Sequence, residues 1–292
     1  MAPVGDRCGE AALWSPDEGA LYWCDVNRFL IHRLDAAEAV RTWFFDEPVT
    51  ALALTSDPER LLVALASRLI IWRPADDGRK DYGFALDDFP AARLNDGRAA
   101  PNGDFWIGSM SHNVGPNGEA LSAKPGLGRL FRLRPDRGVT EHKADLGISN
   151  TVDWSPDRRT FYFGDTMRNL IWAYDYDPET GDIANERPFF QGFERGVPDG
   201  SVIDAEGFLW NCRFDGGCVV RVAPSGQIDR VVEVPARNIT TAAFGGPDLR
   251  TLYITTAAMM SDEADRLGGS LFALPTETPG LLSHRLAILP GR

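Results

Sequence analysis

The sequence predicts an all-β fold, a six-bladed β-propeller of four-stranded blades that takes in residues 1–292 as a single domain. Two observations support this prediction. One pattern of short strands and turns recurs six times along the chain, at intervals close to the ~40–50 residues that a propeller blade needs. In addition, no segment shows the 3.6-residue spacing of apolar side chains that is typical of an amphipathic helix.

Each copy of the pattern has an apolar strand, a turn with Pro, Asp or Gly, an aromatic-rich strand and an alternating third strand. These features are the signals of β-hairpins. Three copies are clear, and they read AALWSPDEGALYWCDV, TVDWSPDRRTFYFGDT and GSVIDAEGFLWNCRF. Three are weaker, and they read ALALTSDPERLLVALAS, DGRAAPNGDFWIGSM and TAAFGGPDLRTLYITTA. The residues directly before the copies are, in chain order, Glu10, Thr50, Asn95, Asn150, Asp199 and Thr240.

Hairpin signals alone do not count blades, so a β-sandwich or a pair of small β-domains is the alternative. Recurrence at a regular interval favours the propeller, because it separates repeat folds from sandwiches. Only nine residues precede Glu10. We therefore expect the C-terminal segment SHRLAIL, residues 283–289, to contribute more than the N-terminus to closing the ring of blades.

The third copy is the longest, and its excess lies in residues 111–128, which read SHNVGPNGEALSAKPGLG. The segment is rich in Gly, Pro and Asn, which are typical of surface loops. Long loops in compact domains are commonly lids or binding loops. We expect this role for the 111–128 loop.

The composition is that of a globular protein with excess negative charge: 43% of the residues are hydrophobic, 25% are charged, and the net charge is −12. This charge argues against nucleic acid and against anionic membranes as partners. The chain has no apolar run of membrane-spanning length, and because MAPVGDRCGEAALW lacks a basic start and an apolar stretch, we expect no secretory signal. Its four cysteines have no CxxC spacing, which favours free thiols in a reducing compartment. We expect a cytoplasmic protein, a monomer or weak homo-oligomer, that acts on a small molecule.

Equivalent positions of the blades lie at equal radii in a propeller, so the six residues that precede the copies meet around the central channel. Two carboxylates and two amides crowded there would be costly if left unsatisfied. A divalent cation resolves this cost, with Glu10, Asn150 and Asp199 as oxygen ligands. The alternative is that these residues only cap turns, which is less credible at four of six equivalent positions.

Oxygen ligands favour Ca²⁺, which is the ion we expect, with Zn²⁺, Mn²⁺, Mg²⁺ and Fe²⁺ as alternatives. Three protein ligands leave coordination positions for water and substrate. Open positions are typical of catalytic rather than structural metal sites.

The stretches RCGEAALW, RLNDGRAAPNGDFWIGSM, GISNTVDWSPD, VPDGSVIDAEGFLW and FGGPDLRTLYIT resemble the senescence marker protein/gluconolactonase family, which includes regucalcin and bacterial sugar lactonases. The resemblance covers nearly the whole chain, and it implies a six-bladed propeller that holds one divalent metal. The family's metal-binding Glu, Asn and Asp fall on the three residues that the repeat had selected, Glu10, Asn150 and Asp199.

The resemblance also implies substrate contacts. The Arg and Asn of the family's R-x-N-D-G motif fall on Arg93 and Asn95, and its acidic residue on Asp96. Some relatives carry a carboxylate where this chain has only His112 and Asn113. We predict substrate contacts from His112 and from the 111–128 loop, through Glu119 and Lys124, in place of that carboxylate.

The family implies hydrolysis of a sugar lactone, an aldono-1,4- or 1,5-lactone like gluconolactone, to the aldonic acid in sugar catabolism. A divalent metal can polarise the carbonyl and activate water, Asp199 is the expected catalytic base, and Arg93 would donate hydrogen bonds to substrate oxygens. The alternatives are an esterase or phosphotriesterase-like hydrolase at the same site, and a non-catalytic calcium- or ligand-binding propeller. The sequence has no GxSxG elbow, no HExxH pair, and no GxGxxG or GxxxxGK[ST] loop.

Overall fold

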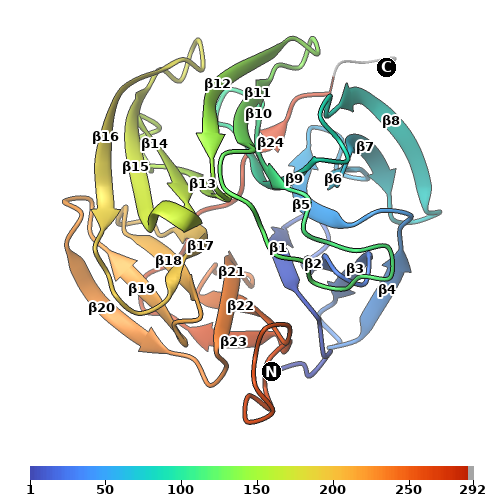
Figure 1. Ribbon diagram of the computed structural model, residues 1–292, viewed down its shortest axis with the longest axis vertical. Coiled ribbons are helices and arrows are strands. Elements are labelled where there is room, and N and C mark those ends of the chain that lie inside the picture. The colour runs from blue at the N-terminus through green and yellow to red at the C-terminus, as the bar shows by residue number, and fades with distance from the viewer. Residues whose placement is uncertain (289–292) are drawn as a thin grey trace.

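Six sheets surround a central axis in the computed structural model, which describes residues 1–288 (Figure 1). The prediction of a six-bladed β-propeller is therefore confirmed. Blades 1, 3, 4 and 5 have four antiparallel strands each. Blade 2 gains a fifth short strand, and blade 6 has three strands in the described part of the chain. The last four residues of the predicted domain, 289–292, lie outside the described residues.

Blade 1 consists of β1 (Gly9–Ser15), β2 (Ala20–Asp25), β3 (Leu30–Leu34) and β4 (Val40–Phe44). Blade 2 consists of β5 (Val49–Thr55), β6 (Leu61–Leu65), β7 (Arg68–Arg73), β8 (Gly78–Ala85) and the added β24 (Arg285–Leu286). Blade 3 consists of β9 (Ala92–Ala99), β10 (Phe105–Ser111), β11 (Gly128–Leu133) and β12 (Val139–Leu146). Blade 4 consists of β13 (Ser149–Trp154), β14 (Thr160–Asp165), β15 (Leu170–Tyr176) and β16 (Ile183–Gln191). Blade 5 consists of β17 (Val197–Ile203), β18 (Leu209–Phe214), β19 (Cys218–Val222) and β20 (Ile228–Glu233). Blade 6 consists of β21 (Asn238–Gly245), β22 (Thr251–Ala257) and β23 (Phe272–Pro275).

The inner strands of each blade form the core, because both of their faces pack against neighbouring blades. Strands β2, β6, β10 and β13 are buried at every residue, whereas the outer strands β4 and β20 are mostly exposed. Trp23, Trp106 and Trp154, which recur in the repeat, are among the largest fully buried side chains. The one helical element of residues 1–288 is a 3₁₀ turn, η1 (Thr166–Arg168), and no helix there is long and apolar enough to cross a bilayer.

The pairing between the innermost strand and its neighbour shifts register once in every blade, at the ring residue. In β1 the register shifts between Glu10 and Leu13, and in β13 between Asn150 and Val152. In β17 it shifts between Pro198 and Ser201, which brackets Asp199. The innermost strands of the other three blades shift in the same way around their ring residues, Thr50, Asn95 and Thr240. Each of the six ring residues thus lies at a bulge, a feature that re-aims a side chain.

The N-terminal segment closes the ring against blade 6. Ala2 exchanges two backbone hydrogen bonds with Leu271, at 2.8 and 2.9 Å, and Ala258 N donates to Asp6 O at 3.1 Å. The expectation that the C-terminal segment contributes more to closure is therefore wrong. A few N-terminal residues are enough to close the ring, because Ala2 pairs with the edge of blade 6, whose other strands are already held together.

The C-terminal segment instead crosses the end of the propeller opposite the 111–128 loop. Gly280 bridges to Asp204 of blade 5, His284 packs on Trp154 of blade 4, and Ala287 N donates to Gly103 O in the β9–β10 turn. It ends in β24, which lies parallel to β5. This end of the channel is covered by the chain itself.

Candidate metal centre

The three predicted metal ligands come from three different innermost strands and are enclosed by the blades. Asn150 on β13 and Asp199 on β17 are buried, with 5% and 7% of their surfaces exposed, and Glu10 on β1 is half-buried. Thr50 and Thr240 complete the ring as buried hydroxyls. All of these residues stand on innermost strands, and their assembly into a metal site stays a prediction.

The two carboxylates of the ring destabilise each other's charge. Burial and the nearby charge of Asp96 raise the pKa of Glu10 well above its usual range. Burial, Glu10 and Asp96 together raise the pKa of Asp199 well above its usual range. The guanidinium of Arg93 opposes both shifts but does not cancel them. A pair of buried carboxyl groups that cannot both ionise unaided is the arrangement that a divalent cation would stabilise.

The amide of Asn150 is held in one orientation. The Thr166 hydroxyl donates its hydrogen to Pro198 O at 2.7 Å, so its oxygen is left to accept from Asn150 Nδ2 at 2.8 Å. The NH₂ group is therefore turned toward η1, and Oδ1 faces the ring, where Asn95 Nδ2 lies 3.1 Å away. This is the orientation that a neutral oxygen ligand requires.

Within residues 1–288 no group of three or more His, Cys, Asp or Glu side chains could hold a metal ion. The ring differs from such a group because its third oxygen comes from an amide. Two carboxylates whose pKa values are raised, together with an oriented amide oxygen, nevertheless form a donor set of the hard type. The residues present fit a divalent cation.

Arg93 lies beside the ring with its guanidinium largely fixed. Its Nε donates to Asn113 Oδ1 at 2.9 Å, and its Nη1 donates to Asn95 Oδ1 at 2.6 Å and to Leu94 O at 2.8 Å. Among the described residues Nη2 has no acceptor. Burial lowers the pKa of Arg93 to about 10, so the group remains a cation at neutral pH. Its free edge can donate to an oxygen of a ligand.

Asn95 connects Arg93 to the ring. Its Oδ1 accepts from Arg93, and its Nδ2 also donates to Ser149 O at 2.7 Å. The structure thus brings together Arg93, Asn95 and Asn150, as the sequence predicts. Neither Asn113 nor Thr166 was assigned a supporting role from the sequence, because both reach the site through bends of the chain that the repeat pattern does not describe.

Asp96 faces the opposite side of the ring. It lines a small cavity with Thr241, Ser283 and His284, where burial raises its pKa and the charge of Arg98 lowers it. Its charge is felt by both Glu10 and Asp199. A substrate contact from Asp96 stays a prediction.

The two residues of the 111–128 loop that are predicted to contact substrate make their hydrogen bonds within the loop. His112 is half-buried against Phe89, and its Nε2 lies 2.7 Å from Val114 O. Glu119 is exposed at the loop tip, where its carboxylate accepts from Asn117 N at 2.8 Å. Neither side chain is hydrogen-bonded to a ring residue in the described structure. Their substrate contacts stay predictions.

Comparison with known proteins agrees with the motifs. Residues 8–258 match the family described as SMP-30/Gluconolactonase/LRE-like region. The chain belongs to this family. It is 34% identical to the pentonolactonase XacC of Haloferax volcanii over 98% of this chain and 96% of that one, and 34% identical to the 6-deoxy-6-sulfogluconolactonase of Pseudomonas putida over 93% and 92%. The family resemblance predicted from five motifs is confirmed.

Solved structures show the same fold. A calcium-binding protein, regucalcin, from Agrobacterium tumefaciens superposes with a TM-score of 0.89 at 30% identity, over 97% of this chain and 95% of that one. The high coverage of both chains means that the shared fold extends over nearly the whole length of each.

Proposed function

We propose that the protein is a metal-dependent lactonase that hydrolyses a sugar lactone to its aldonic acid in sugar catabolism. The observation that supports the proposal is a set of neighbouring groups: two carboxyl groups with raised pKa values, an oriented amide oxygen and a guanidinium with one free edge. Relatives named for pentono- and sulfogluconolactones support a sugar lactone as the substrate class. The four cysteines are free thiols, which fits a cytoplasmic enzyme.

Glu10, Asn150 and Asp199 would hold the metal, and Ca²⁺ is the ion we propose. When bound, a divalent cation supplies a Lewis acid for the lactone carbonyl and lowers the pKa of water. Asp199 accepts the proton of the attacking water at a carboxylate oxygen. The water oxygen bonds to the carbonyl carbon, the ring C–O bond breaks, and the proton passes to the departing ring oxygen, which becomes a hydroxyl group.

Arg93 and Asn95 orient the sugar. The free Nη2 of Arg93 donates to a carbonyl or hydroxyl oxygen, while its other nitrogens are fixed by Asn95, Asn113 and the backbone. Such pre-fixed donors lose little entropy on binding and so favour a defined substrate pose. Five- and six-carbon lactones both present oxygens of this kind.

The test is acid release by metal-free protein to which Ca²⁺, Zn²⁺, Mn²⁺, Mg²⁺ or Fe²⁺ is added back, measured in a pH-stat. The substrates are five- and six-carbon aldonolactones, an aryl ester and a phosphotriester. We expect metal-dependent acid release that is fastest with an aldonolactone. Faster turnover of the aryl ester or phosphotriester would favour a broader hydrolase. Tight Ca²⁺ binding without turnover would identify a binding protein and contradict the proposal.

A further inference from the structure

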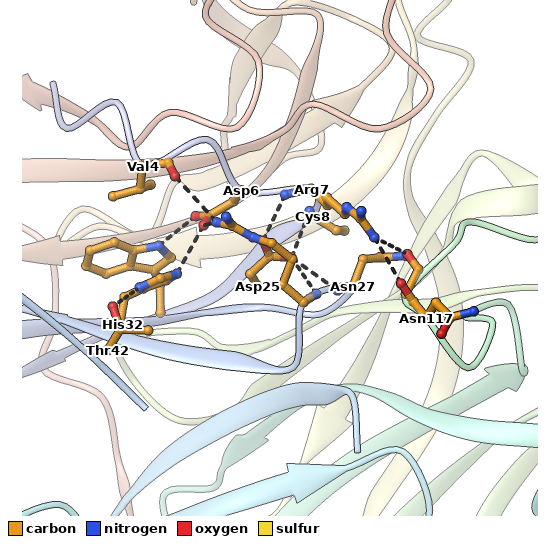
Figure 2. Close-up of polar contacts among 12 residues, drawn as sticks. Val4, Asp6, Arg7, Cys8, Asp25, Asn27, His32, Thr42 and Asn117 are labelled. Carbon is orange, nitrogen blue, oxygen red and sulfur yellow. Dashed lines mark hydrogen bonds and ion pairs between the residues drawn. The ribbon is translucent and has the colours of Figure 1, made fainter. Parts of the chain in front are cut away.

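The tip of the 111–128 loop is bound to blade 1, far along the chain from its own blade. Asn27, in the β2–β3 turn, donates from Nδ2 to Gly118 O at 2.9 Å. Arg7 donates from Nη1 to Asn117 O at 3.1 Å and to Gly118 O at 3.3 Å. Figure 2 shows Arg7 pointing at Asn117, and Figure 1 shows the loop, in green, crossing from blade 3 toward blade 1. We call Arg7, Asn27, Asn117 and Gly118 the latch.

The loop tip is shaped for this contact. Gly118 is buried and has a φ of +77°, a conformation that favours glycine. A Cβ at this position would lie 1.8 Å from the backbone oxygen of Asn27. Only glycine allows the loop to approach blade 1 so closely, so the contact depends on this particular residue.

The blade 1 half of the latch is itself fixed. Asp25 is fully buried, and its carboxylate accepts the backbone N–H groups of Arg7 at 2.9 Å and of Asn27 at 3.1 Å. The same carboxylate accepts from Cys8 N (Figure 2). It also accepts from the Arg28 side chain. One carboxylate therefore holds both anchoring residues in place.

The other end of the loop reaches Arg93. Asn113, at the loop base, accepts from Arg93 Nε at 2.9 Å, and its backbone oxygen accepts from Leu121 N at 2.9 Å. Val114 pairs with Ala120 across the loop and is buried in the core shared by blades 1 and 2. The tip, the paired arms of the loop and Arg93 thus form one connected series of contacts.

We propose that Asn27 and Arg7 are positioning residues for substrate binding: they hold the 111–128 loop against blade 1 so that Asn113 keeps the Arg93 guanidinium aimed at the sugar. This inference rests on the proposed function. Loss of the latch frees the loop, lets Arg93 turn away from Asn113 and weakens binding of the lactone. Since Arg93 contacts the substrate before and during the reaction, the effect falls on KM more than on kcat.

The test uses Asn27→Asp, which keeps the shape of the side chain but turns its donor into an acceptor that faces Gly118 O. We expect hydrogen exchange of the amides in residues 113–121 to become about tenfold faster, and KM for the preferred aldonolactone to rise about tenfold with kcat within about twofold. Arg7→Ala, at an exposed residue, removes the second anchor without burying a charge, and a smaller change in the same direction is expected.

Asn102→Asp is the matched control. Asn102 Nδ2 donates to Asp104 at 2.8 Å in the β9–β10 turn, at the opposite end of blade 3, so a comparable loss of stability occurs there without touching the loop. The control should leave both loop exchange and KM unchanged. Unaltered loop exchange in Asn27→Asp and Arg7→Ala would overturn the latch, and a freed loop with normal KM would overturn its positioning role. If the wild type hydrolyses no lactone, the proposed function is wrong. Hydrogen exchange of the loop amides then still tests whether the latch holds the loop against blade 1.

Discussion

At the scale of single residues, the site depends on side chains that orient other side chains. The Thr166 hydroxyl donates its only hydrogen to Pro198 O, so its oxygen can only accept a hydrogen bond from Asn150 Nδ2. Asn113 and Asn95 hold two of the three guanidinium nitrogens of Arg93. These partners fix which atoms of Asn150 and Arg93 face the axis. The ligands themselves follow from the repeat, but their orientation follows from these contacts.

Thr166→Val tests the orientation of Asn150. The change keeps the size of the side chain but removes the acceptor for Asn150 Nδ2, so the amide is free to turn. We expect Ca²⁺ affinity, measured by calorimetry, to fall about tenfold to 100-fold, the usual cost of losing a partner that orients a metal ligand. Thr256→Val is the control, because this buried hydroxyl likewise donates to a backbone oxygen, that of Ser270, at 2.7 Å. Equal affinities in the two variants would contradict the role of Thr166.

At the scale of elements, the sequence predicts where the ring residues lie better than it predicts the connections. The spacing that picked out Glu10, Asn150 and Asp199 works because each residue stands at a bulge of an innermost strand, and a bulge occupies a fixed place in every blade. Ring closure was not predictable in the same way. It depends on scattered backbone hydrogen bonds from Ala2, Asp6 and Arg7 to blade 6, and such isolated contacts leave no alternating pattern in the sequence.

The 111–128 loop was predicted as a lid from its length and composition alone. Its attachment to blade 1 through Asn27 could not be predicted, because the two partners are 91 residues apart and neither belongs to a motif. Glu119 accepts from Asn117 of its own loop, a contact that the sequence likewise does not predict, and its contact with substrate stays a prediction. Loop side chains take their direction from tertiary contacts rather than from local pattern.

A histidine in the C-terminal segment, His284, should make the stability of the protein depend on pH. Burial, together with the charges of Arg158 and Arg98, lowers the pKa of His284 from 6.5 to about 4. The unfolded chain thus binds a proton at a higher pH than the folded protein does. The stability that neutral His284 contributes is full above about pH 6.5 and is lost as the pH falls toward 4.

His284→Gln removes this titration. From pH 7 to pH 4 the free energy of unfolding, measured with urea, should fall less in the variant than in the wild type, by up to about 3 kcal/mol. The carboxylates that titrate in the same pH range contribute equally to both proteins, so their contribution drops out of the difference between variant and wild type. Parallel pH profiles would contradict the burial of a neutral imidazole against Trp154.

At the scale of the whole molecule, the propeller gives its two channel ends different roles. One end carries the ring, Arg93 and the 111–128 loop, and the C-terminal segment covers the other, where His284 and Asp96 line a small cavity. The excess of acidic residues, with a net charge of −12, makes a cation the natural partner of the central carboxylates.

The central claim is that Glu10, Asn150 and Asp199 hold one metal ion on which lactone hydrolysis depends. The most direct measurement titrates Ca²⁺ into metal-free wild type and into Glu10→Gln, Asn150→Ala and Asp199→Asn, following bound metal and acid release from gluconolactone together. We predict one ion per wild-type chain, activity that rises with occupancy, and about 100-fold or greater loss of both in each variant whose circular dichroism is unchanged. Normal metal occupancy in the three variants would contradict the claim.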